Sequence, residues 1–68
     1  MLAENVKRYR IKMGLSQDQL ARKAGITYST LTKLESGVNQ NPKVKTLQQI
    51  AKALGVTLND LMNESTGR

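Results

Sequence analysis

The sequence contains no cysteine, histidine, tryptophan or phenylalanine. Without cysteine, the chain can form neither a disulfide framework nor a thiolate metal site. Without histidine, it lacks the commonest general base and the commonest transition-metal ligand, and its five carboxylates are spread along the chain. We therefore expect no enzyme active site, no bound metal and no cofactor.

The sequence also lacks a long apolar segment. No apolar run approaches the length of a membrane span or of a signal-peptide core. A basic amphipathic helix at a membrane surface is poorly supported as well, because neither tryptophan nor phenylalanine is present to anchor it. We therefore expect no membrane partner and a cytoplasmic location.

Positive charge is in excess, since eleven lysines and arginines outnumber five aspartates and glutamates and give a net charge of +6 over 68 residues. This length indicates one small domain, and the 38% of apolar residues permits only a modest core. A small basic domain without catalytic residues favours a binding module, for which nucleic acid is the first partner to consider.

Glycines divide the chain into helical segments. Four of them follow stretches of helical apolar spacing, as expected for residues in a left-handed turn past a helix end: Gly14, Gly25, Gly37 and Gly55. No alternating pattern indicates a strand, so the predicted class is all-α. The predicted helices span residues 2–13, 17–24, 28–36, 44–54 and 58–63. Residues 1–63 are predicted to form the domain, and residues 64–68 a flexible tail.

Local signals mark the helix starts. Ser16, followed three residues later by Gln19, matches a capping box, and Thr27 and Thr57 are further predicted N-caps. The start of the fourth helix is open, because Lys43 is a poor cap and the preceding proline could begin the helix earlier. Within the first helix, a stripe of apolar residues recurs every three or four positions: Leu2, Val6, Tyr9 and Met13.

The second and third predicted helices are joined by so tight a turn at Gly25 that they must cross steeply. Ala21 and Ala24 leave room for this close crossing. At about 100° per residue, Leu31 and Leu34 share one side of the third helix. Its other side is polar and nearly free of acid, and comprises Tyr28, Ser29, Thr32, Lys33 and Ser36.

The segment from Leu15 to Gly37, Leu-Ser-Gln-Asp-Gln-Leu-Ala-Arg-Lys-Ala-Gly-Ile-Thr-Tyr-Ser-Thr-Leu-Thr-Lys-Leu-Glu-Ser-Gly, resembles the helix-turn-helix of the XRE or phage-repressor-like family. The segment from Thr46 to Val56 is similar to that family's fourth helix and the turn after it. The resemblance covers about residues 4–62. It implies a compact five-helix lambda repressor-like fold with its motif at about residues 16–36. The third helix would enter the DNA major groove, usually in a dimer on a two-fold-related site.

The resemblance also implies roles for individual residues. Side chains in the first turn of the third helix and one turn later would read base edges: Tyr28, Ser29, Thr32 and Lys33. Phosphate contacts would flank this helix, from side chains and from backbone N–H groups of the 38–43 loop: Ser16, Gln17, Thr27, Ser36, Asn39, Gln40, Asn41 and Lys43. Tyr28 and Ser29 depart from the glutamines frequent in the family, so the operator sequence does not transfer.

The family further implies a partly buried ion pair between Arg10 and Glu35, which would tie the first helix to the third. Such a pair is weak evidence of stability, because desolvation offsets much of its attraction, but losing one partner leaves an uncompensated charge. The proposed role of the pair is therefore orientation of the reading helix.

Two functions remain open from the sequence. The first is a sequence-specific transcription regulator of bacterial or phage origin, most simply a repressor, that binds double-stranded DNA as a homodimer on a near-palindromic operator. The alternative is an antitoxin or protein-interaction module, which could also regulate its own operon. Its dimer or partner surface would be the apolar end of the fifth helix, formed by Leu58, Leu61 and Met62. The other interpretation of these residues is that they belong to the core, because a five-helix domain needs its last helix to cover the fourth.

Overall fold

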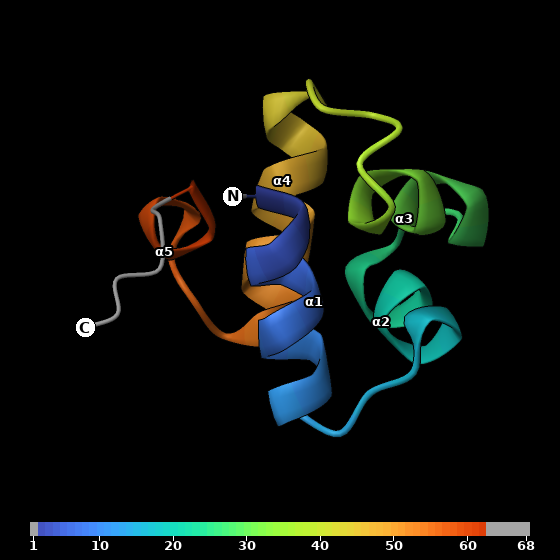
Figure 1. The fold of residues 1–68 in the computed structure, drawn as a ribbon. Coiled ribbons are helices and arrows are strands. Elements are labelled where there is room, and N and C mark those ends of the chain that lie inside the picture. Colours follow the sequence, from blue (N-terminus) through green and yellow to red (C-terminus); the bar gives the residue numbers. More distant parts are fainter. Residues whose placement is uncertain (1, 63–68) are drawn as a thin grey trace.

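The computed structural model describes residues 2–62, which form five helices and no strand (Figure 1). The helices are α1 (Leu2–Lys12), α2 (Gln17–Ala24), α3 (Tyr28–Glu35), α4 (Val44–Leu54) and α5 (Leu58–Met62). The predicted all-α class and helix order are confirmed. Two helices end one residue earlier than predicted, because Met13 lies in a turn and Ser36 is the C-cap of α3. Residue 63 and the predicted tail at 64–68 lie outside the described residues.

Reciprocal side-chain bonds fix two of the helix starts. The Ser16 hydroxyl accepts a bond from the Gln19 N–H at 3.1 Å, and the Gln19 side-chain oxygen accepts one from the Ser16 N–H at 2.8 Å. This is the predicted capping box. Thr57 and Asp60 form the same arrangement at α5, with both bonds at 3.0 Å. Because these bonds satisfy backbone groups that the helix itself leaves unpaired, the starts of α2 and α5 are specified locally.

The starts of α3 and α4 differ in their capping. The Thr27 hydroxyl accepts a bond from the Thr30 N–H at 3.0 Å, so Thr27 is the predicted N-cap of α3. Lys43 is the N-cap of α4 and makes no side-chain capping bond. The helix begins after Lys43 and not at Pro42, which answers the question that the sequence left open.

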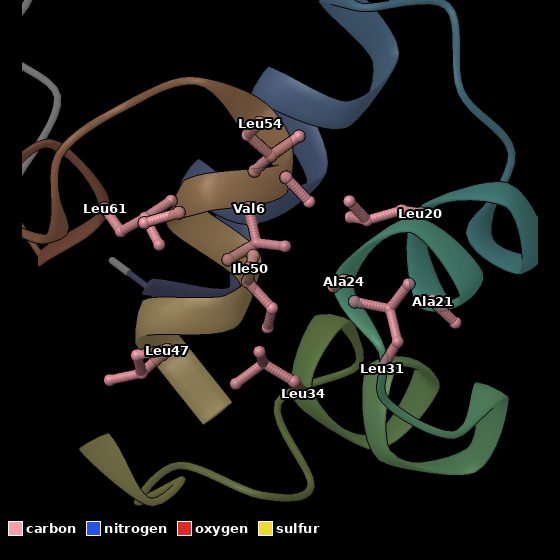
Figure 2. Packing of buried hydrophobic residues seen from close by; sticks show 12 residues of the cluster. Val6, Leu20, Ala21, Ala24, Leu31, Leu34, Leu47, Ile50, Leu54 and Leu61 are labelled. Atoms are coloured by element: carbon pink, nitrogen blue, oxygen red, sulfur yellow. The ribbon is translucent and has the colours of Figure 1, made fainter. Parts of the chain in front are cut away.

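The helices pack in three groups. α1 lies across α4, α2 and α3 pack on one side of this pair, and α5 packs on the other (Figure 1). α2 contacts both α3 and α4, whereas α5 contacts α1 and α4. Figure 2 shows the leucines of α2 and α3 gathered near the centre of the molecule, with Leu61 on the α5 side. Six large side chains are essentially inaccessible: Val6, Leu20, Leu31, Leu34, Ile50 and Leu61.

Leu61 lies in the core, as expected if the last helix covers the fourth, and not on a partner surface at the end of α5. This side chain is 0% exposed, and Leu58 is partly buried against the same core. Met62 is 53% exposed. The physical reason is that α5 covers apolar groups of α1 and α4, so its leucines face inward.

The stripe predicted along α1 also ends early. Met13 is exposed because α1 stops at Lys12 and the chain turns away through Gly14, whose φ is +74°. An unpredicted polar contact lies on the buried side of α1. The Asn5 side-chain amide is buried and donates to the Leu61 carbonyl at 2.8 Å, which ties α1 to α5. Asn5 therefore satisfies a carbonyl in the last turn of α5.

Candidate nucleic-acid interface

One side of α3 is buried and the other faces solvent. Leu31 and Leu34 pack into the core. The four predicted base-reading residues lie on the outer side, where all but the half-buried Thr32 are exposed: Tyr28, Ser29, Thr32 and Lys33. The Thr32 hydroxyl donates to the Ser29 carbonyl at 3.0 Å, so its oxygen is left as an acceptor. The outer side therefore offers one ammonium group, hydroxyls and an aromatic ring.

Predicted phosphate contacts gather at the starts of α2 and α3. Ser16 and Thr27 are exposed and hold these helix starts through their capping bonds. The Thr27 and Thr30 hydroxyls also bond each other at 2.7 Å. Gln17, the first residue of α2, is half-buried because its amide nitrogen donates to the Glu35 carboxylate at 3.1 Å. Gln17 thus combines a predicted ligand role with a contact between α2 and α3.

The 38–43 loop does not present free backbone N–H groups at three of its positions, which corrects the prediction. The Val38 N–H donates to the Ser36 hydroxyl at 3.4 Å, and the Asn39 N–H donates to the Lys33 carbonyl at 3.0 Å. The Asn41 N–H donates to the Asn39 side-chain oxygen at 3.1 Å. The loop thus folds onto the end of α3, and the N–H groups of Val38, Asn39 and Asn41 are engaged within the chain. Its exposed polar side chains belong to Gln40, Asn41 and Lys43.

Ser36 has a structural role at the end of α3. Its hydroxyl donates to the Lys33 carbonyl at 3.1 Å and accepts the bond from Val38. A phosphate contact from this hydroxyl would compete with the bonds that hold the loop. Lys43, at the other end of the loop, is exposed and contributes a positive charge without a capping bond.

The ion pair expected between Arg10 and Glu35 is present. Two guanidinium nitrogens of Arg10 donate to the two carboxylate oxygens at 2.7 and 3.1 Å, and a third donates to the Leu15 carbonyl at 2.8 Å. The side chains are only 11% and 3% exposed. Together with Gln17, this network joins α1, the chain before α2, and the two helices of the motif. The family resemblance implied the pair, but no signal in the sequence indicated the bond from Gln17 to Glu35 or the bond from Arg10 to the Leu15 carbonyl.

A second Arg–carboxylate pair lies in water. Arg22 contacts Asp18 one turn earlier on α2, and the side chains are 78% and 51% exposed. A hydrogen bond to Asp18, followed by attraction to its charge, raises the pKa of Arg22. Asp18 is therefore paired within α2, and Glu35 is buried and paired, so neither adds an unpaired carboxylate to the outer side of α3.

Within residues 2–62, no cluster of three or more aspartates or glutamates is placed to hold a metal ion. In the same part of the chain, every helix falls short of the length and apolarity needed to cross a bilayer. The arrangement offers binding groups on a rigid helix, and the described carboxylates do not converge on one point.

α2 packs Leu20, Ala21 and Ala24 into the core and is joined by the tight turn at Gly25 to α3, whose polar side faces solvent. This arrangement defines the class as a helix-turn-helix domain. The model of the helix-turn-helix family matches residues 6–61. The chain therefore belongs to the helix-turn-helix family, in its XRE or phage-repressor-like branch.

Known relatives agree with this assignment. The chain is similar to the transcriptional regulator SinR of Bacillus licheniformis, with 34% identity over 94% of this chain and 58% of SinR. It is 34% identical to the immunity repressor protein of Bacillus phage phi105, over 96% of this chain and 44% of the repressor. A crystal structure of SinR in complex with DNA superposes with a TM-score of 0.90 and 32% identity, covering 93% of this chain and all of that one. The chain thus spans about half the length of these regulators, and its fold matches all of the SinR chain solved with DNA.

Proposed function

We propose that this chain binds double-stranded DNA in a sequence-specific manner through α3 and regulates transcription, most simply as a repressor. The single observation that carries the proposal is the outer side of α3, which is polar and solvent-facing while its inner side is locked into the core. The relatives support it, since one is a transcriptional regulator, one is a phage repressor and one was solved with DNA.

The chemistry of the outer side suits base edges in the major groove. The Lys33 ammonium is a donor for guanine N7 or O6. Thr32, whose hydroxyl hydrogen is engaged within α3, is an acceptor for an amino group of adenine or cytosine. Ser29 either donates or accepts, and the Tyr28 ring suits contact with a thymine methyl group while its hydroxyl reaches a base or a phosphate. The operator therefore depends on side chains unlike the glutamines frequent in the family.

Phosphate contacts are proposed on both flanks of α3. On one flank, Ser16, Gln17 and Thr27 lie at helix starts, where the helix dipole favours an anion. On the other flank, the internal bonds of the loop leave side chains rather than backbone N–H groups as the main donors. These are the side chains of Asn39, Gln40, Asn41 and Lys43, with Ser36 next to them.

We further propose that two copies bind one near-palindromic site in the cytoplasm, with residues 1–63 as the binding domain. The chain acts by occupancy, without catalysis, cofactor or membrane contact. The alternative function through the end of α5 loses one of its three residues, because Leu61 is in the core. Leu58 is half-buried and Met62 is exposed, so these two residues offer a protein partner a small apolar contact.

Selection of bound duplexes from a random pool at two salt concentrations tests the proposal. We expect one short near-palindromic motif to be enriched, with log affinity falling by about 0.9 per neutralised phosphate for each tenfold rise in salt. A matched shuffled duplex, with the same base composition, should bind at least about a thousandfold more weakly. Binding without any enriched motif would contradict sequence-specific recognition, and no binding at low salt would contradict the DNA function altogether.

A further inference from the structure

Glu35 is a buried carboxylate that accepts hydrogen bonds from two other helices. Arg10 of α1 donates to both of its oxygens, and Gln17 of α2 donates to Oε1 at 3.1 Å. The Glu35 side chain is 3% exposed. It faces α1 and α2, away from the outer side of α3. If the ion pair serves to orient α3, this role explains the contact of Glu35 with Arg10. It does not explain the contact of Glu35 with Gln17.

The contact determines how the Gln17 amide faces solvent. A carboxylate accepts hydrogen bonds and donates none, so it attracts the NH₂ end of the amide and repels the carbonyl end. With one amide hydrogen on Glu35, the nitrogen retains a second hydrogen for another acceptor. A Gln17 amide turned the other way would bring its oxygen against Glu35. Glu35 therefore selects one of the two amide orientations.

The position of Gln17 shows why the selected orientation of its amide matters for phosphate binding. Gln17 is the first residue of α2, next to the Ser16 cap, at the end of the helix where an anion is favoured. A phosphate oxygen accepts hydrogen bonds and cannot donate one at neutral pH, so only the NH₂ end of the amide can bind it. The same end is the one that Glu35 holds in place.

We propose that Glu35 is a positioning residue for DNA binding, which orients the Gln17 amide so that its second hydrogen meets a backbone phosphate. This inference rests on the proposed DNA-binding function. It adds a role for a residue that does not itself reach DNA, and it predicts that the two side chains act as one unit. It also predicts that the contribution is independent of base sequence, because phosphate contacts position a protein without reading bases.

A double-mutant cycle on duplex affinity tests the proposal, with Q17M, E35Q and the combined variant. Q17M keeps the side-chain length and removes the donor, so we expect binding to fall about tenfold, the value of one hydrogen bond to a charged group. E35Q permits the flipped amide and should weaken binding by a similar factor. The combined variant should bind the duplex as tightly as the single variant that has the lower affinity. Each loss should be the same on the selected duplex and on a shuffled duplex.

D18N is the matched control, because it also removes one carboxylate charge near the start of α2 but leaves Gln17 and Glu35 intact. Its duplex affinity should stay the same or rise, since the net charge becomes more positive. Additive losses in the cycle, or unchanged affinity of Q17M, would overturn the proposal. A loss confined to the selected duplex would instead show that E35Q tilts α3, and would also overturn it.

A second measurement applies if E35Q does not fold. In the unmodified chain, the Gln17 side-chain amide proton that is not bonded to Glu35 should shift its NMR signal when the selected duplex is added. Signals that stay in place while the backbone amides of α3 shift would overturn the positioning role and leave the proposed function standing. If the unmodified chain binds no duplex, the proposed function itself fails.

Discussion

The two sides of α3 differ in how strongly the rest of the fold constrains their side chains. On the inner side, Leu31 and Leu34 are buried and Glu35 is engaged by two helices, so each side chain has several simultaneous constraints. On the outer side, Tyr28 and Lys33 are exposed, so burial in the core does not constrain them as it constrains the inner residues. Packing of the inner side therefore fixes the position of α3. The base sequence that α3 recognises depends instead on the exposed side chains of its outer side.

The two Arg–carboxylate pairs show the same contrast in a single type of interaction. Arg10 and Glu35 are buried and share a network with Gln17, whereas Arg22 and Asp18 lie in water on the surface of α2. Removing one member of a buried pair leaves a charge without compensation, but solvent replaces a partner that is lost at the surface. The effect of losing one partner therefore depends on the burial of the pair, and the geometry of the pair alone does not predict it.

The largest expected effect comes from the inner side of α3. We expect Leu31→Ala to lower the free energy of unfolding by about 3–4 kcal/mol, because a fully buried leucine loses its packing and leaves a cavity in a small core. Urea unfolding followed by circular dichroism measures this change. A loss below about 1 kcal/mol would show that the inner side is not constrained as the contrast requires.

The next effect concerns the buried ion pair. Glu35→Gln should lower the free energy of unfolding by about 3 kcal/mol, because the Arg10 guanidinium is left buried without a full opposite charge. The control is Asp18→Asn on the exposed pair, which should leave the urea midpoint unchanged within measurement. Equal changes for the two variants would remove the distinction between the pairs.

On the outer side, Lys33→Ala should leave stability unchanged and alter recognition. We expect a loss of about 1–3 kcal/mol of discrimination at one base pair, since the ammonium group is the proposed donor to a guanine. Competition binding against a panel of single-base variants of the selected duplex measures this effect. An equal loss on every duplex would reassign Lys33 to phosphate contact.

Lys43→Ala should produce the smallest change. Because Lys43 is exposed at the edge of the loop and its proposed partner is a phosphate, binding should weaken equally on all duplexes. The slope of log affinity against log salt should become shallower by about 0.9. The measurement is a salt titration by fluorescence anisotropy, and an unchanged slope would place Lys43 outside the interface.

Local chemistry explains what the sequence could predict. The periodicity of Leu31 and Leu34 and the caps at Ser16 and Thr27 depend on residues within one turn of helix, so they were visible without a structure. The family resemblance added the Arg10 pair, which joins positions far apart in the chain and has no periodic signal.

What the sequence did not predict depends on how the helices pack together. The sequence left Leu61 between a core role and a partner surface, and the position of α5 on α1 and α4 decides for the core. The Asn5 bond to the Leu61 carbonyl and the Gln17 bond to Glu35 each join two helices through a polar side chain that could equally have faced solvent. The 38–43 loop was misjudged at Val38 and Asn39, whose N–H groups bond to the end of α3, and at Asn41, whose N–H bonds to the Asn39 side chain.

Binding of DNA through α3 is tested most directly by NMR, with the backbone amide signals of the chain followed while a selected duplex is added. We expect shifts concentrated at residues 28–33 and at the start of α2, with little change in α5. Signals at residues 28–33 that stay in place while the duplex binds elsewhere would contradict it.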